Sequence, residues 1–139
     1  MKKLSKKERD LLKLKYDGHC SYCGELLGDK WHVDHFKPVK RRHELYKDQW
    51  GYKTRLIGAD NIENHNLDNF MPACISCNLS KSTYSLEQWR KILANYIKVI
   101  ERNTPTYRIA KRYGQVIETN KPIVFHFEKI ELKKDDNQS

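Results

Sequence analysis

The sequence predicts a small α+β fold, and three features of the 139-residue chain support this assignment. Two short apolar runs of β character, at 31–39 and 69–74, each lie near a Cys-x-x-Cys pair. A long segment, 85–102, repeats apolar residues at helical spacing. Apolar residues make up only 38% of the chain and charged residues 32%, so the core is small. A chain of this kind often needs a metal or a disulfide to stabilise it.

Two helices are predicted, and each begins at a serine that fits a capping box. Ser5 pairs with Glu8 in the first, which spans 5–16 and ends at Gly18. Ser85 pairs with Gln88 in the second, which spans 85–102. The apolar residues of the second helix are interpreted as core, not as a cofactor site: Leu86, Trp89, Ile92, Leu93, Tyr96, Ile97 and Ile100.

The remaining segments have weaker signals. Residues 40–66 are polar and without a clean period, which indicates a long loop with one helical turn. Residues 114–119 and 122–130 are joined around Asn120-Lys121 and predict a hairpin. Residues 133–139 have nothing to bury and are expected to be disordered. We therefore expect a main domain at 1–103, a helix and hairpin extension at 104–132 and a tail at 133–139.

The charge balance favours a polyanionic partner. The chain has 27 Lys and Arg against 18 Asp and Glu, a formal net charge of +9, which suits nucleic acid. A merely solvated basic surface is the alternative. No run approaches the roughly 20 apolar residues of a membrane span, and Lys and Arg interrupt the N-terminal segment throughout, as a signal peptide would not allow. We expect an intracellular, cytoplasmic protein with reduced thiols and no membrane contact.

The four cysteines form two Cys-x-x-Cys pairs, Cys20/Cys23 and Cys74/Cys77. Each pair can present two thiolates to one ion, and two pairs complete the tetrahedral Cys₄ set of structural zinc. A redox Cys-x-x-Cys is the weaker alternative, because two pairs are present with no cysteine left over. The sequence therefore predicts one zinc ion that joins regions about 50 residues apart in the chain.

The stretch "WHVDHFKPV" places two imidazoles and a carboxylate within four residues, at His32, Asp34 and His35. A zinc site would bring this stretch beside "CISCNLSK", which contains Asn78. Asp and Asn oxygens suit a hard cation such as magnesium, and a nearby imidazole can accept a proton from water. These groups suffice for metal-assisted hydrolysis of a phosphodiester.

Four motifs between residues 18 and 82 carry a family resemblance: "CSYCG", "VDHFKPV", "NFMPAC" and "CISCNLSK". In this order they resemble the HNH endonucleases, also called His-Me finger or ββα-metal nucleases. With Asn after the last cysteine, the chain is similar to phage endonucleases that resolve branched DNA. The resemblance implies a ββα-metal core with flanking helices, and a metal-dependent endonuclease that makes nicks or double-strand breaks in duplex or branched DNA.

The resemblance also implies a role for each matching residue. His35 would be the general base, and Asp34 with Asn78 would hold a magnesium or manganese ion against the scissile phosphate. Asn69 would brace the loop that carries His35. Lys81 would face a phosphate. A non-cleaving zinc ribbon that binds nucleic acid is the alternative, and a structural protein stapled by zinc is a further one. The oligomeric state is open, with a homodimer as one option.

The interval between His35 and Asn69 is longer than in compact members of the family, so residues 36–68 are interpreted as a basic insertion. We expect Lys37, Arg41 and Arg42 to contact the DNA backbone; a solvated loop is the alternative. Strict strand alternation would send Asp34 and His35 to opposite faces. His32 is more simply a strand residue. Two loop histidines are weaker candidates for DNA contact: His43 and His65.

Overall fold

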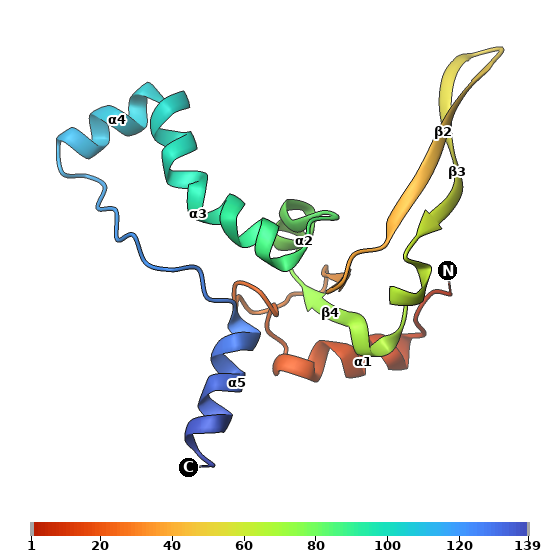
Figure 1. Ribbon diagram of the computed structural model, residues 1–139, viewed down its shortest axis with the longest axis horizontal. Coiled ribbons are helices and arrows are strands. Elements are labelled where there is room, and N and C mark those ends of the chain that lie inside the picture. The colour runs from red at the N-terminus through yellow and green to blue at the C-terminus, as the bar shows by residue number, and fades with distance from the viewer. Residues whose placement is uncertain (1, 139) are drawn as a thin grey trace.

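The computed structural model describes residues 2–138 and confirms the predicted α+β class. Its centre consists of β1 (His32–His35), β4 (Phe70–Ala73) and α2 (Ile75–Lys81). β1 and β4 pair antiparallel, with the first residue of β1 opposite the last residue of β4. α2 follows β4 directly and contacts β1. This strand–strand–helix unit places the segments "WHVDHFKPV" and "CISCNLSK" side by side, and Figure 1 shows β4 and α2 at the centre of the molecule.

α1 (Lys6–Lys13) begins as predicted, with a capping box between Ser5 and Glu8. A short 3-10 turn, Leu14–Tyr16, extends it. The chain then reverses through Asp17 and Gly18, both in left-handed backbone conformations, which is costly for Asp and easy for Gly. α1 packs against β4, so it supports the strand that leads into the second cysteine pair.

α3 (Leu86–Asn103) confirms the second predicted helix and its capping box. Trp89 is 1% exposed, stacks on Phe125 at 5.1 Å and meets the edge of Tyr22 at 5.1 Å. This aromatic cluster is the centre of the core. The expectation that the whole apolar face of this helix is core is wrong for its second half. Tyr96, Ile97 and Ile100 are about 40% exposed, because α3 extends beyond the core.

The predicted C-terminal hairpin is wrong. After α4 (Pro105–Arg112) the chain returns without a strand, and α5 (His126–Asp136) occupies the expected second strand. The alternation that suggested a strand reflects buried Phe125 and Phe127 on either side of a helix start. Glu128 fixes that start by accepting a hydrogen bond from the Phe125 backbone at 2.9 Å and by pairing with Arg90.

The C-terminal segment is tied to the core by backbone hydrogen bonds. His126 N donates to Tyr22 O, and Phe127 N donates to Ser21 O, both at 2.9 Å. Residues 133–136, expected to be disordered, form the last turn of α5, while residue 139 lies outside the described residues.

The predicted long loop at 40–66 is also wrong. It forms an antiparallel hairpin of β2 (Lys40–Asp48) and β3 (Gly51–Asp60), followed by 3-10 turns Ile62–Asn64 and Leu67–Asn69. The hairpin projects from the core (Figure 1), so neither face is buried and the strands show no apolar period. We call this hairpin the arm. Within residues 2–138, no helix combines the length and apolarity needed to cross a membrane.

Candidate active site and metal centre

The four cysteines converge on one point. The Sγ atoms of Cys20, Cys23, Cys74 and Cys77 all lie within 4.8 Å of one another, and those of Cys23 and Cys74 are 3.9 Å apart. Tetrahedral zinc with Zn–S bonds of about 2.3 Å requires S···S distances of roughly 3.8 Å. The cluster therefore has the dimensions of a zinc site.

The chemistry of the cluster fits the same ion. Burial and neighbouring sulfurs raise the pKa of Cys23 to about 11, whereas a hydrogen bond with Cys77 lowers the pKa of Cys20 to about 4, so without a cation the cluster holds both thiolate and protonated thiol at neutral pH. Zinc binding would displace such protons and would couple metal binding to folding. Cys74 lies at the N-cap of α2, so a bound ion would fix the start of that helix relative to the turn at 20–23.

Asp34 points from β1 into the core and is 5% exposed. Its Oδ2 accepts a hydrogen bond from the Tyr22 hydroxyl at 2.5 Å and forms an ion pair with Lys81 Nζ at 2.9 Å. The same Nζ donates to the backbone carbonyl of His35 at 2.8 Å. The Lys81 side chain is fully buried, which corrects its expected role as a phosphate contact. Lys81 is the last residue of α2, and from there its side chain reaches the core side of β1.

His35 lies on the other side of β1, as strand alternation requires. Its Nε2 is 2.9 Å from Nδ1 of His65, whose Nε2 is 2.8 Å from the carbonyl oxygen of Lys2. A carbonyl can only accept, so a neutral His65 carries its proton on Nε2 and accepts at Nδ1. His35 then donates from Nε2 and keeps an unprotonated Nδ1. Burial first, and His65 second, lower the pKa of His35 and favour this neutral form.

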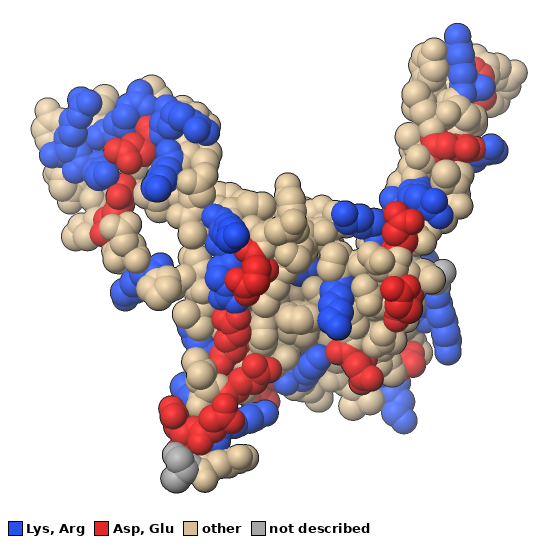
Figure 2. All heavy atoms as spheres, viewed as in Figure 1, with Lys and Arg blue, Asp and Glu red and all other residues tan. Residues whose placement is uncertain are grey.

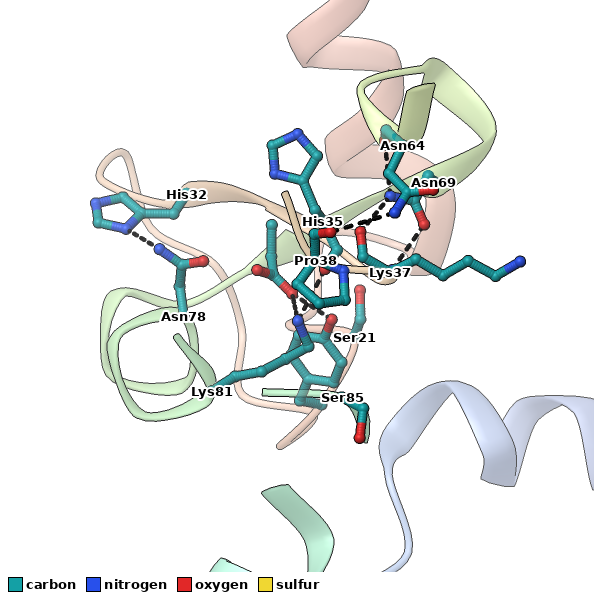
Figure 3. A network of polar contacts seen from close by, with 12 residues as sticks. Ser21, His32, His35, Lys37, Pro38, Asn64, Asn69, Asn78, Lys81 and Ser85 are labelled. Atoms are coloured by element: carbon teal, nitrogen blue, oxygen red, sulfur yellow. Dashed lines mark hydrogen bonds and ion pairs between the residues drawn. The ribbon is translucent and has the colours of Figure 1, made fainter. Parts of the chain in front are cut away.

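Asn69 holds the turn that follows His35 (Figure 3). Its Oδ1 accepts from the Lys37 backbone N–H at 2.8 Å, and its Nδ2 donates to the carbonyls of Lys37 and Asn64 at 2.8 and 2.7 Å. The side chain is 9% exposed and makes contacts of the kind that bracing requires. Two of these three hydrogen bonds hold the turn at 36–38, and the third links the same amide to Asn64.

Asn78 comes from α2 and faces β1. Its Nδ2 donates to His32 Nδ1 at 2.8 Å, while its Oδ1 has no hydrogen-bond partner within the described chain. Asp34, His35, Asn78 and Arg41 all line one hollow of about 360 Å³. Both contacts of Asp34 are made to Oδ2, so its Oδ1 and the Oδ1 of Asn78 have no hydrogen-bond partner within residues 2–138 and are the oxygens that could bind a cation. Two oxygen ligands in a partly open site, with room for water, suit magnesium.

The residues expected to contact DNA differ in their surroundings. The exposed Lys37 side chain points away from the other labelled residues in Figure 3. Arg41 lines the hollow beside Asn78. Arg42 forms an ion pair with Asp60 at 3.2 Å on the arm.

The sequence did not predict two side-chain contacts of the site, that of Tyr22 with Asp34 and that of His65 with His35. Tyr22 lies within "CSYCG", and a tyrosine packed beside a metal turn needs a partner for its hydroxyl, so a neighbouring strand carboxylate was a reasonable expectation. His65 lies 30 residues from His35, and no local pattern links them. Only the fold of the insertion brings the two rings together.

Comparison with known proteins gives one relative of note. The chain is 34% identical over 74 residues to the "SPbeta prophage-derived putative HNH endonuclease YoqL" of Bacillus subtilis (strain 168). The match covers 53% of this chain, which spans about a quarter (27%) of the relative's length. No protein-family model matches the chain, and no solved structure matches it. Together with the cysteine cluster, the similarity to this relative confirms the resemblance to the HNH endonuclease family.

Proposed function

We propose that the chain is a metal-dependent endonuclease that hydrolyses DNA phosphodiester bonds. The observation that carries the proposal is that His35, Asp34 and Asn78 all line one hollow. A neutral imidazole beside two oxygen ligands is the minimal set for attack of water on a phosphodiester. The similarity to a relative named as an HNH endonuclease, and the net charge of +9, support the same conclusion.

His35 acts as the general base in this proposal. Its Nδ1 takes a proton from water as the water oxygen attacks phosphorus, the bond from phosphorus to the 3′ oxygen breaks, and that oxygen is protonated from solvent. The ring is held for this task by the hydrogen bond from its Nε2 to His65. Asn69 fixes the turn that follows it through the Lys37 backbone. A base held in this way needs little reorganisation at the moment of reaction.

Asp34 and Asn78 would hold the divalent ion, with Lys81 and Tyr22 fixing the carboxylate from the core side. When bound, magnesium or manganese would supply positive charge at the scissile phosphate and the leaving oxygen. The cysteine cluster lies at the other end of α2 and would hold zinc in a structural role.

The test is a supercoiled-plasmid assay with magnesium, with manganese and with EDTA, run on zinc-loaded wild type and His35→Ala. We expect nicking that requires the divalent ion and is lost in the variant. His19→Ala is the matched control, because the His19 ring bonds a backbone carbonyl in an exposed turn, lies near the His126 ring and does not line the hollow. It should cut like wild type.

Absence of nicking from folded protein that holds zinc would contradict the proposal, provided that branched DNA is also left intact. Retained duplex binding in that case would favour the alternative, a zinc-ribbon module that holds nucleic acid without cutting it. Equal nicking by His35→Ala and wild type would remove His35 from the mechanism.

A further inference from the structure

The arm stands apart from the rest of the fold. Its two strands contact each other extensively, and Figure 1 shows them projecting into solvent. A strand of nine or ten residues is about 30 Å long at roughly 3.3 Å per residue. A solvated two-stranded hairpin is marginally stable at best. Such a structure is expected to have a partner that covers one of its faces.

The two faces of the arm differ in charge. Cross-strand partners share a face, so the register divides the side chains into two sets. One set, which we call the paired face, has all three carboxylates of the arm, and each is in an ion pair with a cation of the same face. These pairs are Arg42–Asp60, Lys53–Asp48 and Arg55–Glu44.

The other set, which we call the groove face, has no carboxylate. Lys47 lies opposite Tyr52, Leu45 opposite Thr54, and His43 opposite Leu56. Lys47 lies over the Tyr52 ring at 5.6 Å and has no acidic partner among residues 2–138. Figure 2 shows Lys and Arg side chains on the arm, and neither cation of the groove face, Arg41 or Lys47, forms an ion pair within residues 2–138. The groove face therefore has positive charge that no carboxylate neutralises, whereas three of the four cations on the paired face are neutralised.

The groove face is also continuous with the candidate active site. A hollow of about 810 Å³ is lined by Arg41, His43 and Leu56 at the base of the arm. The same hollow is lined by His35, His65 and Asn78. A molecule that fills this hollow therefore contacts the base of the groove face. The paired face contributes none of the residues that line the hollow.

We propose that the groove face of the arm is a DNA-binding surface that extends the active-site groove along the duplex. This inference rests on the proposed function. The major groove of B-form DNA admits a two-stranded β-ribbon, whereas that of A-form RNA is too narrow and deep for side chains to read. An arm of about 30 Å spans roughly nine base pairs at 3.4 Å per base pair. Contact is therefore asymmetric and lies on one side of the scissile phosphate.

Binding measurements with EDTA present test this surface without cleavage. Lys47→Gln removes one of the two unpaired cations of the groove face, and Lys53→Gln is the matched control one cross-strand pair away on the paired face. For a 30-base-pair duplex followed by fluorescence anisotropy, we expect Lys47→Gln to weaken binding about 3- to 10-fold and to reduce the slope of log K against log salt by about 0.9. The control should change neither quantity. Both lysines are exposed, so zinc content and circular dichroism should stay those of wild type.

Hydroxyl-radical footprinting of His35→Ala on a nicked duplex gives a second measurement. We expect protection to extend roughly nine base pairs further on one side of the nick than on the other. If both lysine variants bind DNA with the affinity and the salt slope of wild type, and the protein nicks DNA, the groove face is not a DNA-binding surface and the proposed function stands. Weaker binding by Lys47→Gln in a protein that never nicks would support the arm and reject the nuclease. An equal loss in both variants would overturn the assignment of faces.

Discussion

Replacing Lys81 by Met should destabilise the fold strongly, although a lysine near an active site would ordinarily be taken for a substrate contact. Lys81 is fully buried, and its Nζ is bonded to Asp34 Oδ2 at 2.9 Å and to the His35 carbonyl at 2.8 Å. Methionine keeps most of the volume and removes the charge. The carboxylate of Asp34 is then left in the core with the Tyr22 hydroxyl as its remaining partner.

The size of the effect follows from the burial of both partners. Breaking a buried ion pair by removing one partner costs about 3–5 kcal/mol, because the other charge stays desolvated. At about 1.4 kcal/mol per tenfold, the unfolding equilibrium constant should rise roughly 100- to 4,000-fold. With an m-value of about 1.5 kcal/mol/M in urea, the midpoint of unfolding should fall by about 2–3 M.

Urea unfolding at a fixed free zinc concentration, followed by circular dichroism, measures this shift. Lys91→Met on the exposed face of α3 is the control and should change stability by less than about 0.5 kcal/mol. Adding Asp34→Asn to Lys81→Met should recover part of the loss, since the unpaired charge disappears. A Lys81→Met midpoint within the error of wild type, together with weaker DNA binding, would refute the buried pair and restore Lys81 as a phosphate contact.

Three further outcomes are expected from the site and the cysteine cluster. Cys77→Ser should lower zinc content and helical circular dichroism together, whereas removal of magnesium should leave the spectrum native; a zinc-free variant with a native spectrum would contradict the structural role. His65→Ala should raise the lowered pKa of His35, so that cleavage, which is lost as pH falls through that pKa, is lost at a higher pH; an unchanged acidic limb of kcat/KM would count against the contact. Asn69→Ala should reduce kcat by about 100-fold, because the turn that follows His35 loses two hydrogen bonds and His35 is misplaced. A change confined to KM would contradict this positioning role of Asn69.

The centre of the fold could be predicted from the sequence because several local signals agreed there. Both predicted capping boxes, at Ser5 and at Ser85, are present at the starts of α1 and α3. The cysteine spacing predicted a four-sulfur cluster, and the cluster is present with metal-site dimensions. Spacing was informative because each pair lies on one tight turn, so that two residues at fixed separation determine where their side chains meet.

The wrong predictions concern segments whose burial does not produce a regular spacing of apolar residues in the sequence. The arm has polar residues on both faces, since no core covers either, and a period-two pattern needs one buried face. The segment at 122–130 shows the reverse error. Phe125 and Phe127 alternate like strand residues because both reach the core, but a helix begins between them. The roles of Lys81 and His65 depend on contacts across 46 and 30 residues, which no window of sequence contains.

The division between core and arm has a consequence for how function can be dissected. Lys81 fixes the Asp34 carboxylate and the His35 carbonyl at once, and Asn69 fixes the next turn, so these groups belong to both the fold and the site. Substitutions at these positions should change stability and cleavage together, and loss of activity alone would not assign a chemical role. Lys47 is an exposed residue of the arm, which projects from the core. A change there can alter DNA binding at constant stability. DNA affinity and cleavage chemistry should therefore separate along the boundary between arm and core.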